Sequence, residues 1–383
     1  MSYLQRAEHT LDAIRSENRY RELPQHGLGN VIDFSSNDYL GLATDPQVVE
    51  ALKRATRVGS GGARLLGGRS REHTLLEDEL ADWLGRERAL LFSSGYLAGA
   101  GTIPVVAELV EAILSDQSNH ACLIDGIRLA RQPHAVYEHA ALPPLTGSKT
   151  SLVVSESLFG MEGDAIDPAA LLGRLREQDV LLLDEAHALG IAGPQGAGLA
   201  RELTDPRILI LGTLSKALGS LGGFVAGPAT AIELLVNRAR SFIFDTALPP
   251  SLALASRIAL HLTRSGDDRR RRLRANAAQL RAALAAKLSS FDGVYPERSR
   301  GAQDDTISLR TGSGPIVSIP LGSEQRALRV SEELLKHRIF VPAIRPPTVP
   351  PGTSRLRITI RADHTLEQMD MLAYELGRCL ATL

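Results

Sequence analysis

The chain has 383 residues, and its 43 Lys and Arg nearly balance its 44 Asp and Glu, for a formal net charge of −1. This balance excludes a generally cationic protein that coats nucleic acid, and 44% hydrophobic with 23% charged residues excludes large-scale disorder. Two cysteines, Cys122 and Cys379, are too few for a disulfide framework or a cysteine-rich metal site.

The N-terminal segment predicts an arm without a targeting signal. Residues 1–22 carry apolar side chains at helical spacing, which predicts an amphipathic helix. Charged residues interrupt them, so the apolar core of a signal peptide is missing. No apolar run approaches the roughly 20 residues that a membrane span requires. We therefore expect a cytoplasmic protein that binds neither membrane nor nucleic acid.

Two local signals follow the arm. Residues 31–34 predict a short strand, and a turn-rich stretch occupies residues 35–42. Thr74 and Glu77 have the spacing of a capping box, which predicts that a helix opens there.

Four short apolar runs farther along the chain each end in polar residues. Such runs are typical of strands that are covered on both faces of a mainly parallel sheet. In open α/β sheets, ligands bind outside the carboxyl ends of the strands, so these polar clusters are candidate site residues. The runs cover residues 89–92, 151–154, 180–183 and 208–211.

The C-terminal part departs from this pattern. Residues 252–288 predict one long helix, and its basic stretch, 267–274, is typical of a solvated helix face. Residues 354–361 alternate strictly, which places Arg357 and other polar side chains on one face of a strand. We therefore predict an α/β fold with an N-terminal arm, a large α/β domain and a smaller α+β domain. Their predicted ranges are 1–45, 46–288 and 289–383.

Two of the polar clusters combine the groups that pyridoxal phosphate requires. Asp184 ends one apolar run, and Lys216 follows the next. A carboxylate buried at a strand end needs a cation or a strong donor, and a Lys there can lose its proton and act as a nucleophile. Pyridoxal phosphate needs a Lys for its Schiff base and an acid for its ring nitrogen. Thr213, Ser215 and the amides around Gly95 would offer phosphate donors at a helix N-terminus.

Two other site classes fit less well. The residues Asp184-Glu-Ala-His187 also occur as the acidic box of some helicases, but those enzymes need a phosphate loop that contains Gly-Lys, and the sequence has no such pair. The histidines lack the H-E-x-x-H spacing of a zinc site, so we expect no metal.

Five motifs occur in the order in which the α-oxoamine synthases carry them. The chain therefore resembles this family of pyridoxal-phosphate-dependent enzymes over essentially its whole length. The resemblance implies the transferase fold of type I, with a large cofactor-binding domain, a mainly parallel sheet of seven-stranded type and a small C-terminal domain, assembled as a homodimer with shared active sites. The motifs are residues 35–42, 59–62, 94–96, 184–187 and 213–216.

The resemblance also assigns catalytic roles. Lys216 would hold pyridoxal phosphate, Asp184 would pair with its ring nitrogen, and His187 would hydrogen-bond its ring hydroxyl. His120 would stack on the ring face, and Thr246 would reach the phosphate in the neighbouring subunit.

Further contacts are implied at matching positions. Those to the cofactor are Gly95, Tyr96 and Thr213, and those to substrate are Arg21, Asn37, Thr348 and Arg357, with Arg357 on the amino-acid carboxylate. The family commonly has Ser where this chain has Gly160, so one hydroxyl contact is missing, and the sequence leaves open whether Ser157 replaces it.

One segment narrows the expected reaction. Residues 343–350 resemble the family member of biotin biosynthesis, an acyltransferase that condenses L-alanine with a pimeloyl thioester and releases carbon dioxide. The acyl carrier would be coenzyme A or acyl carrier protein. The alternatives are family members that use glycine and another acyl-CoA and, more remotely, a pyridoxal-phosphate-dependent aminotransferase.

Overall fold

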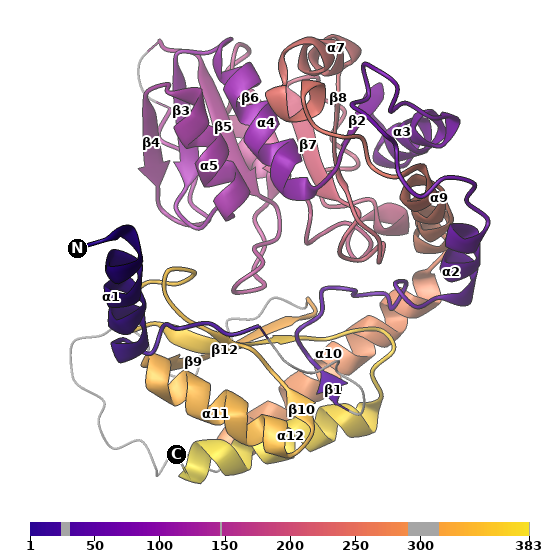
Figure 1. The fold of residues 1–383 in the computed structure, drawn as a ribbon. Coiled ribbons are helices and arrows are strands. Elements are labelled where there is room, and N and C mark those ends of the chain that lie inside the picture. Colours follow the sequence, from indigo (N-terminus) through magenta and orange to yellow (C-terminus); the bar gives the residue numbers. More distant parts are fainter. Residues whose placement is uncertain (24–30, 146–147, 290–313, 383) are drawn as a thin grey trace. The chain divides into compact units, whose positions relative to one another are not determined.

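The computed structural model describes residues 1–23, 31–145, 148–289 and 314–382, and the chain forms two compact units (Figure 1). Unit 1 comprises Met1–Ser36, Met161–Gly163 and Arg272–Leu383, and unit 2 comprises Asn37–Gly160 and Asp164–Arg271. These units follow contacts between residues, whereas the domain boundaries at 45 and 288 were drawn from sequence pattern. Those boundaries stay a prediction.

Unit 2 is built on a seven-stranded sheet, which confirms the predicted α/β class with a mainly parallel sheet. In the described residues, β8 runs opposite to the other strands of this sheet, so its pairings with β2 and β7 are antiparallel and the remaining pairings are parallel. The four predicted runs correspond to β2, β5, β6 and β7. In spatial order the strands are β2 (Arg88–Phe92), β8 (Gly223–Gly227), β7 (Ile208–Thr213), β6 (Val180–Asp184), β5 (Ser151–Glu156), β3 (Ala112–Asp116) and β4 (His134–Tyr137).

Helices cover this sheet, and α4 and α5 lie across the face turned toward the viewer in Figure 1. Apolar side chains of both helices pack with those of the central strands into one buried core, because strands covered on both faces need apolar residues on both. The helices of unit 2 are α2 (Pro46–Lys53), α3 (Arg71–Leu84), α4 (Gly95–Ala107), α5 (Ala121–Ala130), α6 (Pro168–Arg174), α7 (Ala229–Arg238), α8 (Arg240–Ile243) and α9 (Pro250–Arg264), with the short helix η1 (Pro194–Gly196).

Unit 1 holds an antiparallel sheet in the order β11-β12-β9 and a parallel pair, β1 with β10. Leu356 and Ile358 of β12 are fully buried, and α11 contacts all three strands of the sheet. The elements are α1 (Tyr3–Ser16), β1 (Ile32–Asp33), β9 (Ile316–Gly322), α11 (Glu324–Lys336), β10 (Ile339–Phe340), β11 (Ala343–Ile344), β12 (Ser354–Thr359) and α12 (Leu366–Thr382). Helix α10 (Asp267–Ser289) begins in unit 2 and continues in unit 1.

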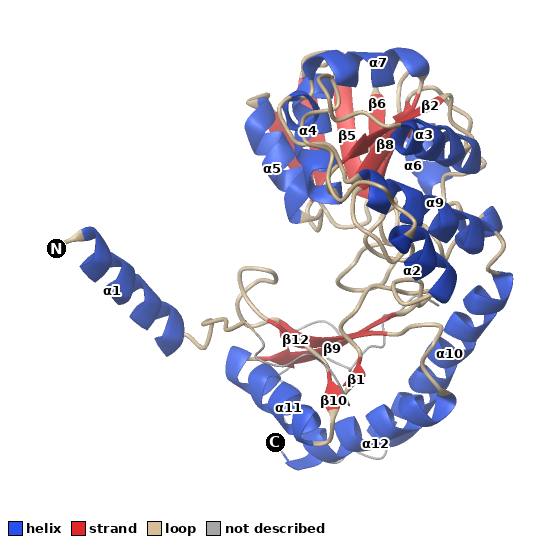
Figure 2. Ribbon diagram, turned by 45° about the vertical axis from the view of Figure 1, so that its right-hand side comes forward, coloured by secondary structure: helices blue, strands red, loops and turns tan. Residues whose placement is uncertain are grey.

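The N-terminal helix is shorter than predicted. Helix α1 ends at Ser16 rather than near residue 22, and Asn18 then adopts a left-handed backbone with φ 56°. No residue of α1 is buried, and the helix extends away from the sheet of unit 1 (Figure 2). Of its apolar side chains, Leu4 and Leu11 are exposed, whereas Ala7 and Ile14 are half-buried.

Two other helix predictions are wrong. Helix α3 starts at Arg71 with Ser70 as its cap, because the ring of His73 accepts the backbone N–H of Ser70 at 3.1 Å; Thr74 lies inside the helix. The helix predicted over 252–288 is two helices, broken at residues 265–266, where Ser265 turns its hydroxyl back to a carbonyl of α9.

The basic stretch at the start of α10 is largely exposed, as predicted, because Arg271, Arg272 and Arg274 face solvent; Arg269 and Arg270 are the exceptions. Arg270 is only 3% exposed and donates to the carbonyl of Thr263 at 2.6 Å, at the end of α9. Arg269 donates to the carbonyl of Leu40 at 2.9 Å. These arginines thus satisfy carbonyl groups that a helix end and a turn leave open. Within the described residues, no helix has both the length and the hydrophobicity to cross a membrane.

Candidate active site

The carboxyl ends of β5, β6 and β7 bring the central predicted residues of unit 2 together. Asp184 is the last residue of β6 and pairs in register with Glu156, the last residue of β5. Lys216 lies in the turn after β7. Gly219 closes this turn at φ +60° and donates to the carbonyl of Lys216 at 2.8 Å. An ideal Cβ at Gly219 would lie 2.2 Å from the backbone nitrogen of Ala43, so the turn needs glycine there.

Asp184 and Lys216 interact electrostatically. Burial raises the pKa of Asp184, while the positive charge of Lys216, the N–H of Ala186 and nearby His120 act in the opposite direction. The N–H of Ala186 donates to Asp184 Oδ1 at 2.8 Å. A buried carboxylate that has an N–H donor and a nearby ammonium is suited to hold a further cationic N–H.

Glu156 is a second buried acid in this cluster. It accepts the backbone N–H of His120 at 2.7 Å. Burial, followed by the charge of Asp184, raises the pKa of Glu156 to about 8. Glu156 thus holds the start of α5 through its hydrogen bond to His120, and burial beside Asp184 disfavours a negative charge on it.

His120 caps α5, and its Nδ1 accepts the backbone N–H of Cys122 at 3.2 Å. Burial of its ring is the largest influence on the pKa of His120 and lowers it; the charge of Asp184 opposes this shift, and the charge of Lys216 adds to it. The imidazole is therefore neutral at pH 7, which suits stacking on an aromatic ring.

His187 lies close to two residues from separate segments. Its Nδ1 is 2.7 Å from the hydroxyl oxygen of buried Tyr39. An ideal Cβ on Gly160 would lie 2.2 Å from His187 Nε2, so the imidazole occupies the space of a side chain at position 160. Ser157 does not replace the hydroxyl that Gly160 lacks, because it donates its proton to Glu185 at 2.8 Å.

The start of α4 is a candidate anion site. Ser94 caps this helix by accepting the N–H of Leu97 at 3.1 Å. An ideal Cβ on Gly95 would lie 3.1 Å from Cβ of Thr213, so the predicted residues Gly95 and Thr213 are neighbours. Tyr96 is 45% exposed and directs its hydroxyl to Asp125.

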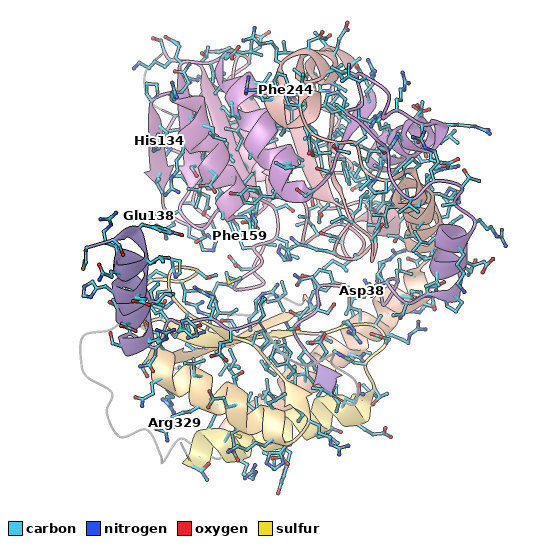
Figure 3. The ribbon with its side chains drawn as sticks, in the orientation of Figure 1. Asp38, His134, Glu138, Phe159, Phe244 and Arg329 are labelled. Atoms are coloured by element: carbon cyan, nitrogen blue, oxygen red, sulfur yellow. The ribbon has the colours of Figure 1, made fainter. Side chains whose placement is uncertain are left out.

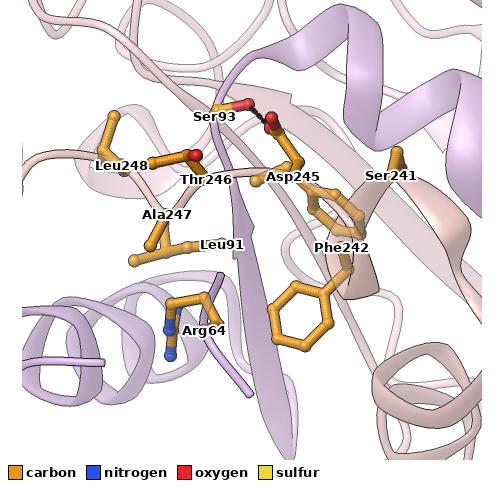
Figure 4. Close-up of a pocket in the computed structure, with 10 residues that line it drawn as sticks. Arg64, Leu91, Ser93, Ser241, Phe242, Asp245, Thr246, Ala247 and Leu248 are labelled. Atoms are coloured by element: carbon orange, nitrogen blue, oxygen red, sulfur yellow. Dashed lines mark hydrogen bonds between the residues drawn. The ribbon is translucent and has the colours of Figure 1, made fainter. Parts of the chain in front are cut away.

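Thr246 lies on a loop that three hydrogen bonds hold in place. Ala247 donates to the carbonyl of Gly62 at 3.0 Å, while Ser60 and His73 both reach the carbonyl of Leu248, at 2.7 and 2.6 Å. Thr246 itself is exposed, and it lines a small pocket next to the hydrogen bond between Ser93 and Asp245 (Figure 4).

The predicted residues Arg21, Thr348 and Arg357 lie in unit 1. Arg357 is 5% exposed, donates to the hydroxyl of Thr359 at 2.9 Å, and stands opposite Ser318 in the register of β12 with β9. The expected polar face of this strand is present but buried, and Arg355 on it pairs with Glu162.

A second group of arginines gathers around residues 343–350. Arg21 donates to the carbonyl of Pro346 at 3.1 Å, and Arg345 donates to the carbonyl of Tyr20 at 3.2 Å. Burial, followed by the charge of Arg21, lowers the pKa of Arg345. Thr348 is close by, since its N–H donates to the carbonyl of Arg345 at 3.1 Å.

Comparison with known proteins places the chain in a family. A model of the aminotransferase class I and II family matches residues 29–376. The chain belongs to this family. A curated relative from Lysinibacillus sphaericus, named 8-amino-7-oxononanoate synthase, is 40% identical over 355 residues, which are 88% of this chain and 86% of the relative.

Solved structures of this family share the fold. A structure of SPT with pyridoxal phosphate has a TM-score of 0.84 at 25% identity, covering 99% of this chain and 98% of that one. The 8-amino-7-oxononanoate synthase of Francisella tularensis has a TM-score of 0.72 at 25% identity, covering 91% of this chain and 98% of that one.

Motif reasoning missed three residues of this candidate family site. Glu156 ends β5, and its signal was the polar residue that closes an apolar run. Tyr39 and Arg345 lie inside motifs that carried the family resemblance, but nothing in the sequence alone indicated that Tyr39 contacts His187 or that Arg345 joins Arg21.

Proposed function

We propose that the protein condenses L-alanine with a pimeloyl thioester, with loss of carbon dioxide, to give 8-amino-7-oxononanoate for biotin biosynthesis. The observation that carries this proposal is the set of relatives named 8-amino-7-oxononanoate synthase, at 40–42% identity over 88–92% of the chain. The grouping of Asp184, Lys216 and His120 at adjoining strand ends supports it.

Unit 2 fits pyridoxal phosphate as the cofactor. Asp184 offers a buried acid to the ring nitrogen, Lys216 offers the amine, and α4 offers N–H groups to the phosphate. An ideal Cβ on Gly223 would lie 2.4 Å from Cα of Gly95, so bare backbone surrounds the start of α4. When bound, the cofactor delocalises into its ring the negative charge that develops at Cα of the amino acid.

Different side chains of unit 2 would hold or transfer the protons of the reaction. Asp184 would hold the proton on the ring nitrogen through a charge-assisted hydrogen bond. Nζ of Lys216 would bind the cofactor and, once free of it, take the proton from Cα of alanine. His187 would donate to the ring hydroxyl, and His120 would cover the ring face.

The arginines of unit 1 would bind the anionic ends of the substrates. Arg357 would bind the alanine carboxylate, since a guanidinium can donate two parallel hydrogen bonds to it. Arg21 and Arg345 have guanidinium groups near one another, so an anion between them would relieve their repulsion. We assign this pair to the distal carboxylate of pimelate or to the acyl carrier, with Thr348 and Asn37 as further substrate contacts.

A homodimer would complete the site. Thr246 is exposed on a loop joined through Ala247 to Gly62. The side chains of Leu66 and Phe244, of which Phe244 is labelled in Figure 3, are 83% and 69% exposed. Exposed apolar groups on adjoining segments favour burial against a second copy, which would bring Thr246 to the phosphate of the partner site.

Hybrid dimers test the shared site. Thr246→Ala and Lys216→Ala subunits should each be impaired alone. After verified subunit exchange, their mixture should regain activity, because one of the two sites in a mixed dimer has both groups intact. Activity of the mixture no higher than that of the two variants separately would contradict a shared site.

The reaction is tested by identifying the product. Purified protein loaded with pyridoxal phosphate is incubated with alanine or glycine and a panel of acyl-CoA donors and pimeloyl acyl carrier protein, and products are identified by mass spectrometry. We expect 8-amino-7-oxononanoate to form fastest from alanine and a pimeloyl donor. Faster reaction of glycine with another acyl-CoA would make the protein a sister synthase, and release of a keto acid from the amino acid would make it an aminotransferase.

A further inference from the structure

His73 is fully buried in α3, and both nitrogens of its ring have hydrogen-bond partners. Nδ1 lies 3.1 Å from the backbone nitrogen of Ser70, and Nε2 lies 2.6 Å from the carbonyl oxygen of Leu248. A buried polar group that loses its partner costs free energy, so both contacts constrain the ring. His73 therefore connects the start of α3 to a loop that lies 175 residues away along the chain.

The chemistry of these partners determines which nitrogen of His73 carries the proton. A backbone N–H can only donate, so Nδ1 accepts from Ser70; the hydroxyl of Ser70, at 2.9 Å, can donate to the same nitrogen. A carbonyl oxygen can only accept, so Nε2 carries the proton and donates it to Leu248. Burial is the largest influence on the pKa of His73 and lowers it, although the bond to Leu248 opposes this shift. The ring is thus a neutral Nε2–H donor.

The carbonyl of Leu248 anchors the loop that carries Thr246. It accepts a second hydrogen bond from the hydroxyl of buried Ser60 at 2.7 Å. The adjacent N–H, that of Ala247, donates to the carbonyl of Gly62 at 3.0 Å. Thr246 is exposed, whereas the two residues that follow it on this loop are buried (Figure 4). Because only Ala247 separates Thr246 from Leu248, a shift of the anchored carbonyl would displace the hydroxyl of Thr246.

We propose that His73 is a positioning residue for the cofactor phosphate: its Nε2–H holds the carbonyl of Leu248, and this bond fixes Thr246 where it reaches the phosphate of the partner site. The phosphate contact of Thr246 rests on the proposed function, but the bond between His73 and Leu248 does not. The hydrogen bond between Ser93 and Asp245 holds the loop on the other side of Thr246, so loss of the His73 bond should loosen Thr246 without releasing the whole loop.

The proton position of His73 can be read directly by nuclear magnetic resonance. Full-length protein labelled with ¹⁵N in histidine gives a long-range ¹H–¹⁵N pattern that identifies the protonated nitrogen of each ring. The variant His73→Gln assigns the signals of His73. We expect the Nε2–H pattern; an Nδ1–H pattern would overturn the bond to Leu248 on which the proposal depends.

Two conservative substitutions separate the two bonds of His73. The amide oxygen of asparagine is as many bonds from Cα as Nδ1 of histidine, so His73→Asn keeps an acceptor for Ser70 but has no donor that reaches Leu248. The amide nitrogen of glutamine is as many bonds from Cα as Nε2, so His73→Gln keeps the donor to Leu248. Loss of the α3 cap and loss of the loop anchor therefore fall on different variants.

The quantity to measure is the preference of the protein for pyridoxal phosphate over pyridoxal, which lacks the phosphate. Cofactor is removed from the full-length protein, and each compound is titrated back to equilibrium by absorbance. Thr246→Ala should lower this preference about tenfold, because a hydrogen bond to a charged group is lost. His73→Asn should lower it about two- to tenfold, with no further loss when it is added to Thr246→Ala. A purely structural role of His73 would weaken the binding of both compounds alike.

Three further variants complete the comparison. His73→Gln should keep the preference. Ser60→Ala removes the other donor to the carbonyl of Leu248 and leaves α3 unchanged, so it should lower the preference, and it serves as the test if His73→Asn does not fold. His261→Gln is the matched control, because this histidine is exposed on α9 of the same unit, and its substitution should leave the preference unchanged.

The possible failures are distinguishable. A preference that is lost in Thr246→Ala but kept in both His73→Asn and Ser60→Ala would overturn this inference alone. Equal losses in His73→Gln and His73→Asn would also overturn it, because the effect would then follow the cap of α3. A preference that Thr246→Ala leaves intact would overturn the cross-subunit contact of the proposed function, and the role of His73 at the phosphate with it.

Discussion

The strand ends of unit 2 hold buried acids, whereas the arginine sites of unit 1 hold buried cations. In unit 2, burial raises the pKa of Asp184 and Glu156, and the nearby charge of Lys216 counters this. In unit 1, burial lowers the pKa of Arg345 and Arg355. Arg345 donates to backbone carbonyls, which do not cancel its charge. Unit 2 thus carries a cluster of acids balanced by its own cation, suited to a cofactor, and unit 1 carries positive charge suited to anionic substrates.

Lys216→Ala should have the largest effect on turnover among these variants. It removes both the cation that balances the acids of unit 2 and the amine for the Schiff base. We expect a loss of about 10⁴-fold in turnover, at the upper end of what a proton-transferring group contributes. Borohydride reduction followed by peptide mapping should label Lys216 in the unmodified protein and no lysine in the variant. Labelling of another lysine in both proteins would contradict the assignment.

Asp184→Asn should lower turnover by about 100- to 1,000-fold, which is the range for removal of one preorganised electrostatic partner. The amide keeps the size of the side chain, so the midpoint of unfolding in urea should change little. Steady-state rates and urea titrations of the same preparation give both quantities. Near-normal turnover would remove Asp184 from the mechanism.

Arg21→Ala should raise KM for the pimeloyl donor about tenfold and leave KM for alanine unchanged, since one charged hydrogen bond contributes about 1.5–3 kcal/mol. Arg329→Ala is the control, because this exposed arginine lies on α11 of the same unit (labelled in Figure 3). Equal effects of the two variants on both substrates would contradict a specific role for Arg21.

The contributions of one histidine in each unit to folding stability should change with pH in opposite directions. In unit 2, hydrogen bonds to Asp116 and Asp164 raise the pKa of His139 from 6.5 to about 10. In unit 1, burial, followed by the charge of Arg361, lowers the pKa of His364 from 6.5 to about 4. The raised pKa of His139 stabilises the fold fully below pH 6.5, and this contribution is lost as the pH rises to about 10. The lowered pKa of His364 stabilises the fold above pH 6.5, and this contribution is lost as the pH falls to about 4.

Urea unfolding of His139→Gln and His364→Gln across pH measures these slopes. His139→Gln should be destabilised by about 1–3 kcal/mol at pH 6, with the deficit shrinking toward pH 10. The pH-dependent part of the His364→Gln deficit should instead shrink as the pH falls from 6.5 toward 4. Deficits that do not vary with pH in either variant would mean that these histidines have ordinary pKa values.

The strands that could be predicted are those whose signal lies within a short segment of the sequence. The apolar runs ending at Asp184 and before Lys216 predicted their strands and the site edge, because a doubly covered strand needs continuous apolar residues. Strand β8 was missed, since its glycine-rich sequence, Gly223–Gly227, carries no such run. Its glycines are required by close neighbours, such as Gly95 beside Gly223, which only the fold brings together.

The remaining errors came from side chains that satisfy distant backbone groups. His73 replaces Glu77 in the cap of α3 while its other nitrogen reaches the carbonyl of Leu248. Arg270 donates to a carbonyl at the end of α9 and is buried there, although most of its neighbours in the predicted solvated stretch are exposed. Such contacts depend on tertiary distances, so spacing along the chain did not reveal them.

The division of labour between the two units is tested most directly by equilibrium titration of the cofactor-loaded protein with L-alanine and with L-alaninamide, which lacks the carboxylate charge. The unmodified protein should bind alanine about 10- to 100-fold more tightly than the amide, because Arg357 binds the carboxylate. Arg357→Ala should lose that preference, and Asp184→Asn should keep it. An unchanged preference in Arg357→Ala, or an equal loss in both variants, would contradict the account.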